Sequence, residues 1–495
     1  MVFRNAPGVS LSDGRNPKLA EFGESLCLDC RENEFDNVKH TYQVGFMNLP
    51  ENIEDTGLWW NPGTPDQKCH GTLTVSRSGK ISLELSDPPN SLMGNRNDIP
   101  IVHGTLKKKV KVSLFGIIIM GDSFANSFRT RTFQIDSLLV GQHLHSKVDE
   151  PVFTDIEIEI EGLYEWVGFP KIPLERNIEK NVVEIVSKNV EPKHFRISSD
   201  LSLSIKQDRY AQYSSRGSTL TIEYTAAIGL SWMSSKSLLD IQSIIYRINS
   251  FLCLALDNPV SLTSVKVSKP KGSTDQQETM AFIYQSLPEM MEESAFFHPS
   301  WFLFSYKMIE NDFEKILSNY LAESDLKIAY DLYFSATAFK HNLLETRFVL
   351  LIQGLEIFHR LTQDCKKFPE EKFEKLKKSL TGCCENEEEK KLVNDSLAFA
   401  NECSLRVRLN QILDAFPSII PNKKQFINEL VNTRNYYTHF DPRMKPKAKF
   451  GLDLWILSNR TEALFSLCIL GNLGFSEEQI QMVCQSASIK RKLAE

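Results

Sequence analysis

Residues 154–161 read Thr-Asp-Ile156-Glu-Ile158-Glu-Ile160-Glu, an unbroken alternation of apolar and polar side chains. Successive side chains of a β-strand point to opposite faces, so the isoleucines would line a core and the glutamates would face solvent. Further strands are expected at 109–119, 131–140, 199–206 and 219–224. We therefore expect strands to dominate the chain up to about Val267.

A hairpin is predicted within residues 71–85, GTLTVSRSGKISLEL. Leu73 and Val75 precede the Ser-Gly turn, and Ile81, Leu83 and Leu85 follow it, which is the alternation that paired strands require. Many short strands without regular intervening helices favour an antiparallel sandwich or barrel over a nucleotide-binding α/β sheet.

The pattern shifts toward helix after the polar stretch Lys269–Gln277 and is almost wholly helical from Leu326 onward. Apolar residues at helical spacing predict one core helix from Ala338 to Leu361. Further helices are expected at 369–379, 387–402, 405–416, from 422 to the motif below, at 452–471 and at 476–492. The predicted class is thus α+β with several domains. A β-rich domain spans 1–325, subdivided near 175–200 and helical after about 275, and an all-α bundle spans 326–495.

The composition is that of a soluble globular protein, with 495 residues, 42% hydrophobic and 24% charged. A net charge of -6 removes any global attraction to nucleic acid, so RNA binding would need a local basic patch. The first residues lack the apolar stretch of a signal peptide, and the longest apolar run, Leu114–Met120, is too short to span a bilayer. Ten cysteines, mostly in apolar surroundings, are interpreted as reduced buried thiols, and a cytoplasmic location is expected.

The helix predicted from Asn422 carries Phe426, Ile427, Leu430 and Val431 on one face, and the next turn of that face brings Arg434. Burial of a guanidinium is costly unless it is paired, so we expect Arg434 to meet a partner, a ligand or a subunit interface. Asn435 and His439 are four residues apart and share a helix face, within reach of the long arginine side chain.

Asp441-Pro442 is expected to end this helix directly after His439, because the residue before proline disfavours the helical conformation. A helix C-terminus stabilises a protonated imidazole, as proton transfer near neutrality requires. Beyond it, four basic residues alternate with uncharged ones and predict a phosphate-contacting strip. These residues are Arg443, Lys445, Lys447 and Lys449.

Spacing alone leaves a structural explanation open, in which Arg434 pairs with an acid and His439 caps helix carbonyls. The segment Arg434-Asn435-x-x-x-His439 resembles, however, the R-x4-H signature of HEPN ribonucleases. Residues 347–360, RFVLLIQGLEIFHR, resemble the first long helix of the ApeA-like HEPN subfamily of bacterial anti-phage defence. The N-terminal half is similar to the β-rich domain that precedes HEPN in ApeA proteins, through 57–62, the 71–85 hairpin and 139–143.

This resemblance implies a metal-independent endoribonuclease in which the RNA 2′-hydroxyl attacks the adjacent phosphate and leaves a 2′,3′-cyclic phosphate. His439 would be the general base or acid, Arg434 would stabilise charge at phosphorus, and Asn435 would orient either group. Because one histidine cannot easily serve as both base and acid, a homodimer or larger assembly is expected to supply a second motif. The substrate would be transfer or messenger RNA, and a phage component sensed by the N-terminal domain would activate cleavage. The alternative is a non-catalytic ligand- or RNA-binding protein whose bundle only dimerises.

Three other sets of residues have more than one interpretation. Cys27-x-x-Cys30 and the adjacent pair Cys69-His70 have the ligand types of a structural zinc site, although neighbouring residues rarely bind one ion together, and buried thiols are the favoured interpretation. Trp59-Trp60 is expected in the core, with an aromatic recognition surface as the alternative. Glu356 is left outside the predicted site, because a salt bridge with Arg434 or Arg360 would explain it equally well.

Overall fold

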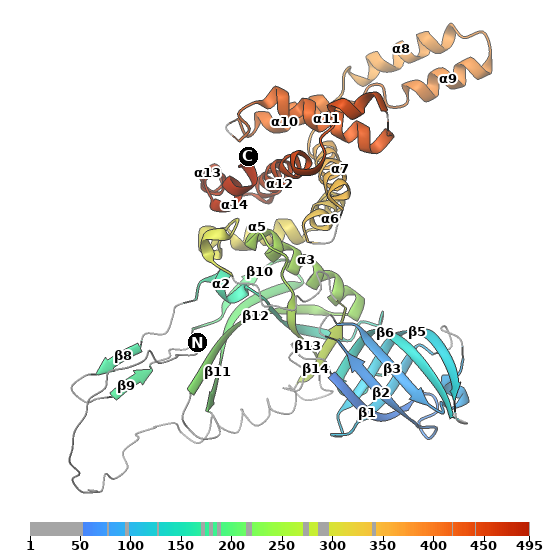
Figure 1. Ribbon diagram of the computed structural model, residues 1–495, viewed down its shortest axis with the longest axis vertical. Helices are drawn as coiled ribbons and strands as arrows, with labels where there is room; N and C mark the ends of the chain where they lie inside the picture. Colours follow the sequence, from blue (N-terminus) through green and yellow to red (C-terminus); the bar gives the residue numbers. More distant parts are fainter. Residues whose placement is uncertain are drawn as a thin grey trace.

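The computed structural model describes residues 53–494, with gaps in that range. The gaps are 77–78, 95–98, 126–127, 170–173, 178–181, 186–189, 214–219, 271–276, 286–296, 339–342, 418 and 441. Along the long axis of the molecule, a β-barrel and a second sheet occupy one end and helices the other (Figure 1).

The first six strands form a closed barrel. The strands are β1 (Ile53–Trp60), β2 (Cys69–Val75), β3 (Ile81–Ser86), β4 (Ile101–Leu106), β5 (Lys111–Ala125) and β6 (Phe128–Gly141), with a 3-10 turn η1 (Asn90–Leu92). Their order is β6-β3-β2-β1-β4-β5, and β5 pairs back with β6. All pairings are antiparallel, and the predicted hairpin is β2–β3, with Leu73 opposite Leu83 and Val75 opposite Ile81. The barrel-like architecture is thus confirmed.

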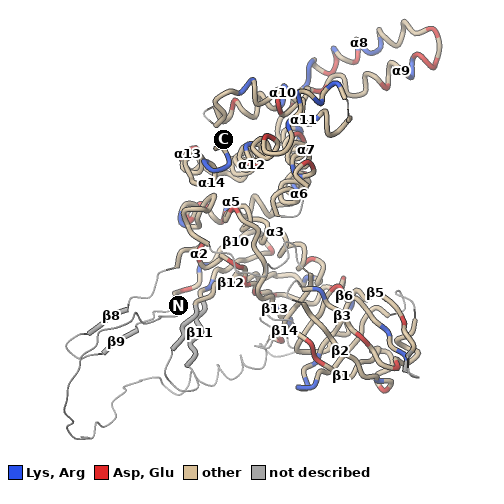
Figure 2. The backbone as a smooth tube through the Cα atoms, in the orientation of Figure 1, with Lys and Arg blue, Asp and Glu red and all other residues tan. Residues whose placement is uncertain are grey.

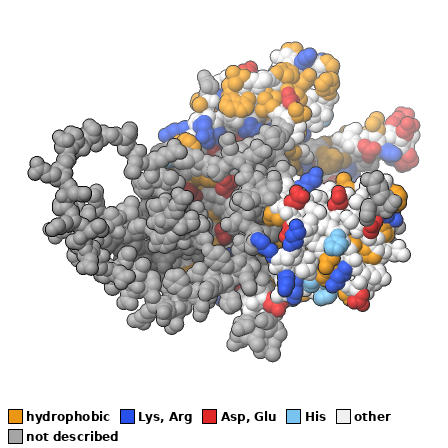
Figure 3. Space-filling model, turned by 60° about the horizontal axis from the view of Figure 1, so that its bottom comes forward, with side chains coloured by type: hydrophobic (Ala, Val, Ile, Leu, Met, Phe, Trp, Pro, Cys, Tyr) orange, Lys and Arg blue, Asp and Glu red, His pale blue; other side chains and the backbone are white. Residues whose placement is uncertain are grey.

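Both tryptophans of β1 are buried, and Trp59 belongs to the core of the barrel. Trp59 is fully buried and Trp60 nearly so. The indole N–H of Trp59 donates to the Gly71 carbonyl at 3.1 Å. A side chain at Gly104 would place its Cβ 2.3 Å from the Trp59 ring, so the ring fills the space above that glycine. The core interpretation is confirmed for Trp59, whereas Trp60 packs edge-on against His143, with 5.1 Å between the ring centroids. The barrel surface carries intermingled basic, acidic and uncharged side chains (Figure 3).

A second antiparallel sheet continues from the barrel through β14, which pairs with β6. Its order is β10-β11-β12-β7-β13-β14. The strands are β7 (Phe153–Ile160), β10 (Lys193–Arg196), β11 (Leu201–Tyr213), β12 (Leu220–Lys236), β13 (Leu262–Pro270) and β14 (Gln277–Tyr284); β8 (Leu174–Asn177) and β9 (Val182–Ile185) pair separately. In β7 the three isoleucines are buried as predicted. The change from barrel to second sheet falls between Gly141 and Phe153, and the subdivision near 175–200 remains a prediction.

A helix inside the β-rich half was not expected. The short α2 (Leu163–Val167) is followed by α3 (Leu238–Leu256), between β12 and β13. Ser237 and Asp240 cap each other reciprocally at the start of α3, which is a sequence signal for a helix N-terminus. Among the described helices α3 has the length and hydropathy of a membrane span, yet 67% of that window is buried inside the protein. Burial identifies α3 as a core helix of the second sheet.

The remaining helices pack at the other end of the molecule. They are η3 (Pro299–Trp301), α4 (Tyr306–Ile309), α5 (Phe313–Leu321), α6 (Leu326–Thr337), α7 (Leu344–Thr362), α8 (Glu370–Gly382), α9 (Glu387–Leu397), α10 (Leu405–Asp414), α11 (Lys423–His439), η4 (Pro442–Lys447), α12 (Gly451–Leu473), α13 (Glu477–Cys484) and α14 (Ala487–Leu493). The hairpin α8–α9 projects away from the others and carries both signs of charge along its length (Figures 1 and 2).

Several predicted boundaries were wrong, and the helix expected at 387–402 ends at Leu397. The core helix begins at Leu344 instead of Ala338, because α6 ends at Thr337 and packs beside α7. The segment 476–492 is two helices, since the Ser486 side chain accepts from the Ile489 N–H and starts α14. Strand β14 follows residue 275, where helix was expected.

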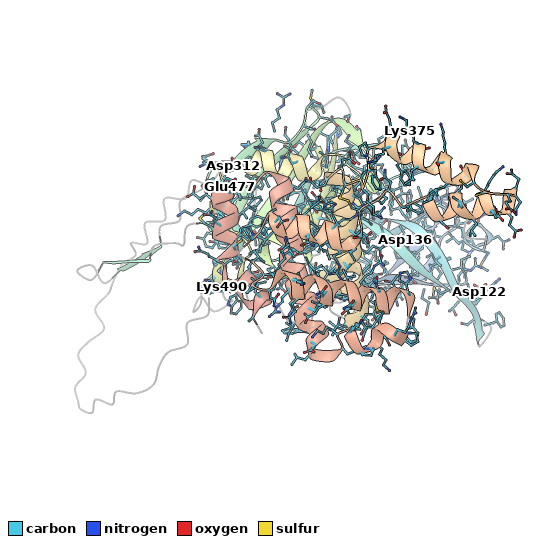
Figure 4. The ribbon with its side chains drawn as sticks, turned by 90° about the horizontal axis from the view of Figure 1, so that it is seen from above. Asp122, Asp136, Asp312, Lys375, Glu477 and Lys490 are labelled. Carbon is cyan, nitrogen blue, oxygen red and sulfur yellow. A yellow bond between two sulfur atoms is a disulfide. The ribbon has the colours of Figure 1, made fainter. Side chains whose placement is uncertain are left out.

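One hydrophobic core joins the second sheet to the helices. It contains Ile158 of β7, Ile245 of α3, Phe313 of α5, Leu351 of α7 and Leu464 of α12. Where α5 meets α13, the Gln479 amide donates to Asp312 at 3.1 Å, and Figure 4 places Asp312 beside Glu477. The boundary at 325/326 therefore crosses continuous packing and remains a prediction.

The cysteines correct the expectation of reduced thiols throughout. Cys365, after α7, is disulfide-bonded to Cys403, before α10. Of the other described cysteines, Cys69, Cys253 and Cys468 are buried free thiols, as expected. The bonded pair lies 38 residues apart in sequence, so the sequence around each cysteine gave no sign of the pairing.

Candidate active site

Helix α11 places the motif at its C-terminal end. It begins at Lys423, after the Asn422 side chain accepts from the Gln425 N–H. It ends at His439 as predicted, and Phe440 takes the left-handed conformation, with φ of 49°. The Phe440 N–H closes the last turn on the Tyr436 carbonyl at 2.8 Å. The motif therefore occupies the last turns of α11, directly before the chain turns away from the helix axis at Phe440.

One face of α11 holds the helix in the core while the motif stays accessible. Phe426, Ile427 and Leu430 are buried, as predicted for an apolar face. Arg434 and Asn435 are half-buried, and His439 is exposed. Burial thus fixes the helix and leaves the motif open to a ligand.

The side chains of Asn435 and His439 both contact the Arg434 guanidinium. Arg434 Nη1 donates to Asn435 Oδ1 at 3.3 Å and lies 3.4 Å from His439 Nε2. With the guanidinium donating, Nε2 accepts and the ring proton resides on Nδ1. Such an imidazole can receive a proton at Nε2, and a positive charge lies beside that atom.

Glu356 of α7 supplies the partner that Arg434 was expected to need. Arg434 Nη2 lies 3.5 Å from Glu356 Oε2, and Arg360 Nη2 donates to Glu356 Oε1 at 3.2 Å. The acid therefore bridges both arginines, and the two salt bridges weighed from the sequence form together. The sequence alone did not assign Glu356 and Arg360 to the site. Only the fold determines which face of α7 contacts α11.

A cavity of about 320 Å³ opens beside the motif arginine. Its lining comes from two helices, α7 and α11. The lining residues are Val349, Gln353, Glu356, Ile357, Arg360, Arg434 and Thr438. Charged groups, an amide and a hydroxyl around a space of this size suit a polar group such as a phosphate and its sugar.

The basic strip divides into two parts. Arg443, Lys445 and Lys447 lie on or at the end of η4 and are exposed. Lys449 lies apart from them, because its amine pairs with Glu429 at 3.2 Å and Asp453 at 3.6 Å. The Lys449 backbone is also held, since its carbonyl accepts from the Tyr437 hydroxyl at 3.3 Å. Three residues of the predicted strip face solvent, and the fourth anchors the segment to α11.

The proposed zinc ligands do not converge as far as the structure describes them. Cys27 and Cys30 lie outside the described residues. Cys69 points into the barrel and its thiol donates to the Trp59 carbonyl at 3.6 Å, whereas His70 is exposed on the opposite face of β2. Burial raises the pKa of Cys69 to about 11, which opposes formation of the thiolate that zinc requires. Cys69 and His70 cannot bind one ion together.

Comparison with protein-family models gives two matches. Residues 54–320 match the model described as ApeA N-terminal domain 1, and residues 349–479 match the model described as Apea-like HEPN. No curated protein and no solved structure matches the chain. The first match covers the barrel, the second sheet and helices through most of α5, and the second contains Glu356, Arg434, Asn435 and His439.

Proposed function

The chain belongs to the ApeA-like HEPN family of anti-phage defence proteins, and on this premise we propose that it is a metal-independent endoribonuclease whose active site is Arg434, Asn435 and His439. The observation that carries the proposal is the convergence of Asn435 Oδ1 and His439 Nε2 on the Arg434 guanidinium, at 3.3 and 3.4 Å, beside a polar cavity.

The chemistry assigns one task to each group. His439 Nε2 removes the proton of the RNA 2′-hydroxyl, and the resulting oxygen attacks the adjacent phosphorus. Arg434 stabilises the charge that develops on the phosphorane oxygens, and Asn435 holds the guanidinium in place. The P–O5′ bond then breaks, leaving a 2′,3′-cyclic phosphate on one fragment. The departing 5′-oxygen must take up a proton, and it thereby becomes a 5′-hydroxyl on the other fragment.

A second copy of the chain would supply that proton. Apolar side chains surround the end of α11 and the start of α12, with Phe440 and Leu452 72% and 71% exposed and Phe450 and Trp455 about half exposed. Apolar surface of this kind is stabilised by burial in an interface. A two-fold axis through it would bring two motifs toward one cleft. We expect a homodimer in which one His439 acts as base and the other as acid.

Activation requires release of an inhibited state. In the free protein Glu356 holds the Arg434 guanidinium beside His439, and an incoming RNA phosphate must share that guanidinium with the carboxylate. We propose that a phage component bound by the N-terminal domain shifts the population toward the competent state. The shared core of the second sheet and the helices supports transmission between the two. Mapping of cleavage positions in cellular RNA identifies whether the substrate is transfer or messenger RNA.

The test compares cleavage by matched variants. Full-length protein, Arg434→Ala, His439→Ala and Lys424→Ala are incubated with cellular RNA in EDTA, with and without extract of phage-infected cells. Lys424 is an exposed residue of the same helix, so its variant controls for substitution on α11. We expect cleavage only by the parent and Lys424→Ala, and more of it with the extract. Equal cutting by the motif variants would remove the site. RNA binding without cleavage would favour the non-catalytic alternative.

A further inference from the structure

A row of alternating charges leads from the motif arginine to the disulfide. Arg434 lies 3.5 Å from Glu356, which lies 3.2 Å from Arg360. Arg360 Nη1 in turn lies 3.3 Å from Glu402 Oε2. Glu402 directly precedes Cys403, one of the bonded cysteines. The row thus connects the end of α11 with the start of α10 across α7.

Glu402 also neutralises a buried arginine. Arg408 Nη2 donates to Glu402 Oε2 at 2.6 Å, and the arginine side chain is only 2% exposed. Its Nε donates to the Cys403 carbonyl at 3.1 Å, and its Nη1 lies 3.2 Å from His359 Nδ1. Burial lowers the pKa of His359, so that ring stays neutral near pH 7 beside the guanidinium. Within these contacts Glu402 is the counterion of Arg408, and loss of its position leaves a buried charge unpaired.

The disulfide holds the segment that carries Glu402. Cys365 follows α7, and besides the covalent bond the Cys403 N–H donates to the Cys365 carbonyl at 3.3 Å. Lys366 and Glu402 form an isolated antiparallel bridge beside it. Together these contacts close the chain around the projecting α8–α9 hairpin. A cavity of about 450 Å³, lined by Arg360, Cys365, Glu402 and Arg408 among others, gives a small thiol reagent a route to the bond.

We propose that Glu402 is a positioning residue of the RNA site, and that the Cys365–Cys403 disulfide controls it. This inference rests on the proposed function. With the disulfide intact, Glu402 draws Arg360 toward α10, and Glu356 remains directed at Arg434. When the bond is reduced, the 402–403 segment is released, Arg360 pairs with Glu356 alone, and Arg434 loses its fixed place beside His439. Cleavage then slows.

The redox step is a thiol–disulfide exchange. A dithiol such as dithiothreitol attacks the bond as a thiolate, forms a mixed disulfide, and leaves as its own cyclic disulfide. Two electrons pass to the protein, and Cys365 and Cys403 each end as a thiol after taking up a proton. A disulfide oxidant of the same class reverses the step.

The experiment compares four full-length proteins, oxidised and reduced, under the conditions in which the parent cleaves RNA. They are the parent, Cys365→Ser with Cys403→Ser, Glu402→Gln, and Cys383→Ser with Cys384→Ser, whose thiols are free and not buried. Reduction should lower kcat of the parent by about tenfold, as misplacement of a catalytic group does, with KM little changed. The Cys383/Cys384 variant should respond as the parent does.

The Glu402→Gln variant distinguishes a positioning role of Glu402 from a purely structural role of the disulfide. It keeps the disulfide, and we expect it to be slow in both redox states, with no further loss on reduction. A Glu402→Gln protein that still responds to reduction, or a parent with equal kcat in both states, overturns the inference. If the parent cuts no RNA at all, the proposed function fails, and hydrogen exchange decides this inference separately. Faster exchange at 353–360 and 434–439 after reduction supports it, and unchanged exchange refutes it.

Discussion

Two charged clusters share helix α7, and they differ in what surrounds them. Near its start, Arg347 pairs with Glu462 of α12, which pairs at 2.7 Å with Lys492 of α14; Lys492 also contacts Asp257 at the end of α3. Near its end, Glu356 pairs with Arg434. The side chains of Glu462, Lys492 and Asp257 are 6–9% exposed, whereas those of Glu356 and Arg434 are 18% and 28% exposed.

This difference in burial separates a structural role from a chemical one. The buried cluster connects the C-terminal helix to the helix that ends in the β-rich half, and each charge has an opposite neighbour. The open cluster borders a cavity, has a long ion pair, and includes a histidine. Buried charges of opposite sign connect the helices to one another, whereas partly exposed charges remain available to a substrate.

The largest expected effect concerns the open cluster. Arg434→Ala and His439→Ala should each lower cleavage by about 10²–10⁴-fold, the usual loss for a general acid or base or an oxyanion donor. Their free energies of unfolding in urea should match that of the parent to within about 0.5 kcal/mol, because substitutions at accessible positions seldom cost more. A large loss of stability in either variant would show that the open cluster is structural too, and would contradict the difference in role between the two clusters.

The next effect concerns the buried cluster. Lys492→Met should lower the free energy of unfolding by about 3 kcal/mol, the lower end for breaking a buried pair, because Asp257 and Glu462 lose their shared cation and keep only Arg491 and Arg347 respectively. Urea unfolding followed by circular dichroism measures the change. Lys490→Met, on the same helix but exposed, is the matched control and should be near neutral (Figure 4). Equal stability of the two variants would contradict a structural role for Lys492.

A third effect is the response of the buried cluster to acid. Burial opposes ionisation of Glu462, but Lys492 and Arg347 outweigh it and hold the pKa of Glu462 below its usual value of 4.5. A lowered folded pKa contributes stability above the unfolded value, and this stability is lost as pH falls through the folded value. The urea midpoint of the parent should therefore decrease as the pH is lowered below about 4.5. The midpoint of Glu462→Gln should decrease less steeply over the same range. Parallel curves would show that Glu462 is not ionised in the folded protein.

The smallest effect concerns the exposed lysines beyond the motif. Lys445→Gln and Lys447→Gln should each weaken RNA binding and reduce the slope of log affinity against log salt by about 0.7. Lys449→Gln should change the slope less, since its amine already pairs with Glu429 and Asp453. Fluorescence anisotropy with a labelled single-stranded RNA, using the His439→Ala background to prevent cutting, measures all three. An unchanged slope in the first two variants would remove the strip from the RNA-binding surface.

Local patterns in the sequence predicted much of this fold, and long-range contacts were beyond them. Ile156, Ile158 and Ile160 gave β7 because a strand has a period of two. The helix α3 was missed although Ser237 and Asp240 mark its start, because its final stretch, 251–256, is apolar throughout and such a run does not distinguish a helix from a buried strand. Closure of the barrel depends on the pairing of β3 with β6 and of β1 with β4. Like the Cys365–Cys403 bond, these pairings join residues whose neighbours in sequence say nothing of the partner.

The site divides in the same way. The end of α11 at His439 and the need of Arg434 for a partner followed from the sequence, since both depend on residues within a few turns. The identity of that partner depended on which face of α7 meets α11. For the same reason the partners of Lys449 could not be predicted: spacing placed it in one strip with Lys445 and Lys447, and the fold brings its amine to Glu429 and Asp453. Its part in RNA binding remains a prediction.

The chemical nature of the RNA ends tests the central claim most directly. Full-length protein is incubated in EDTA with RNA under activating conditions, and the termini are identified by mass spectrometry, with His439→Ala as the control. The account predicts 2′,3′-cyclic phosphate and 5′-hydroxyl ends that require His439. Products with 3′-hydroxyl and 5′-phosphate ends, or cleavage that needs a divalent cation, would contradict it.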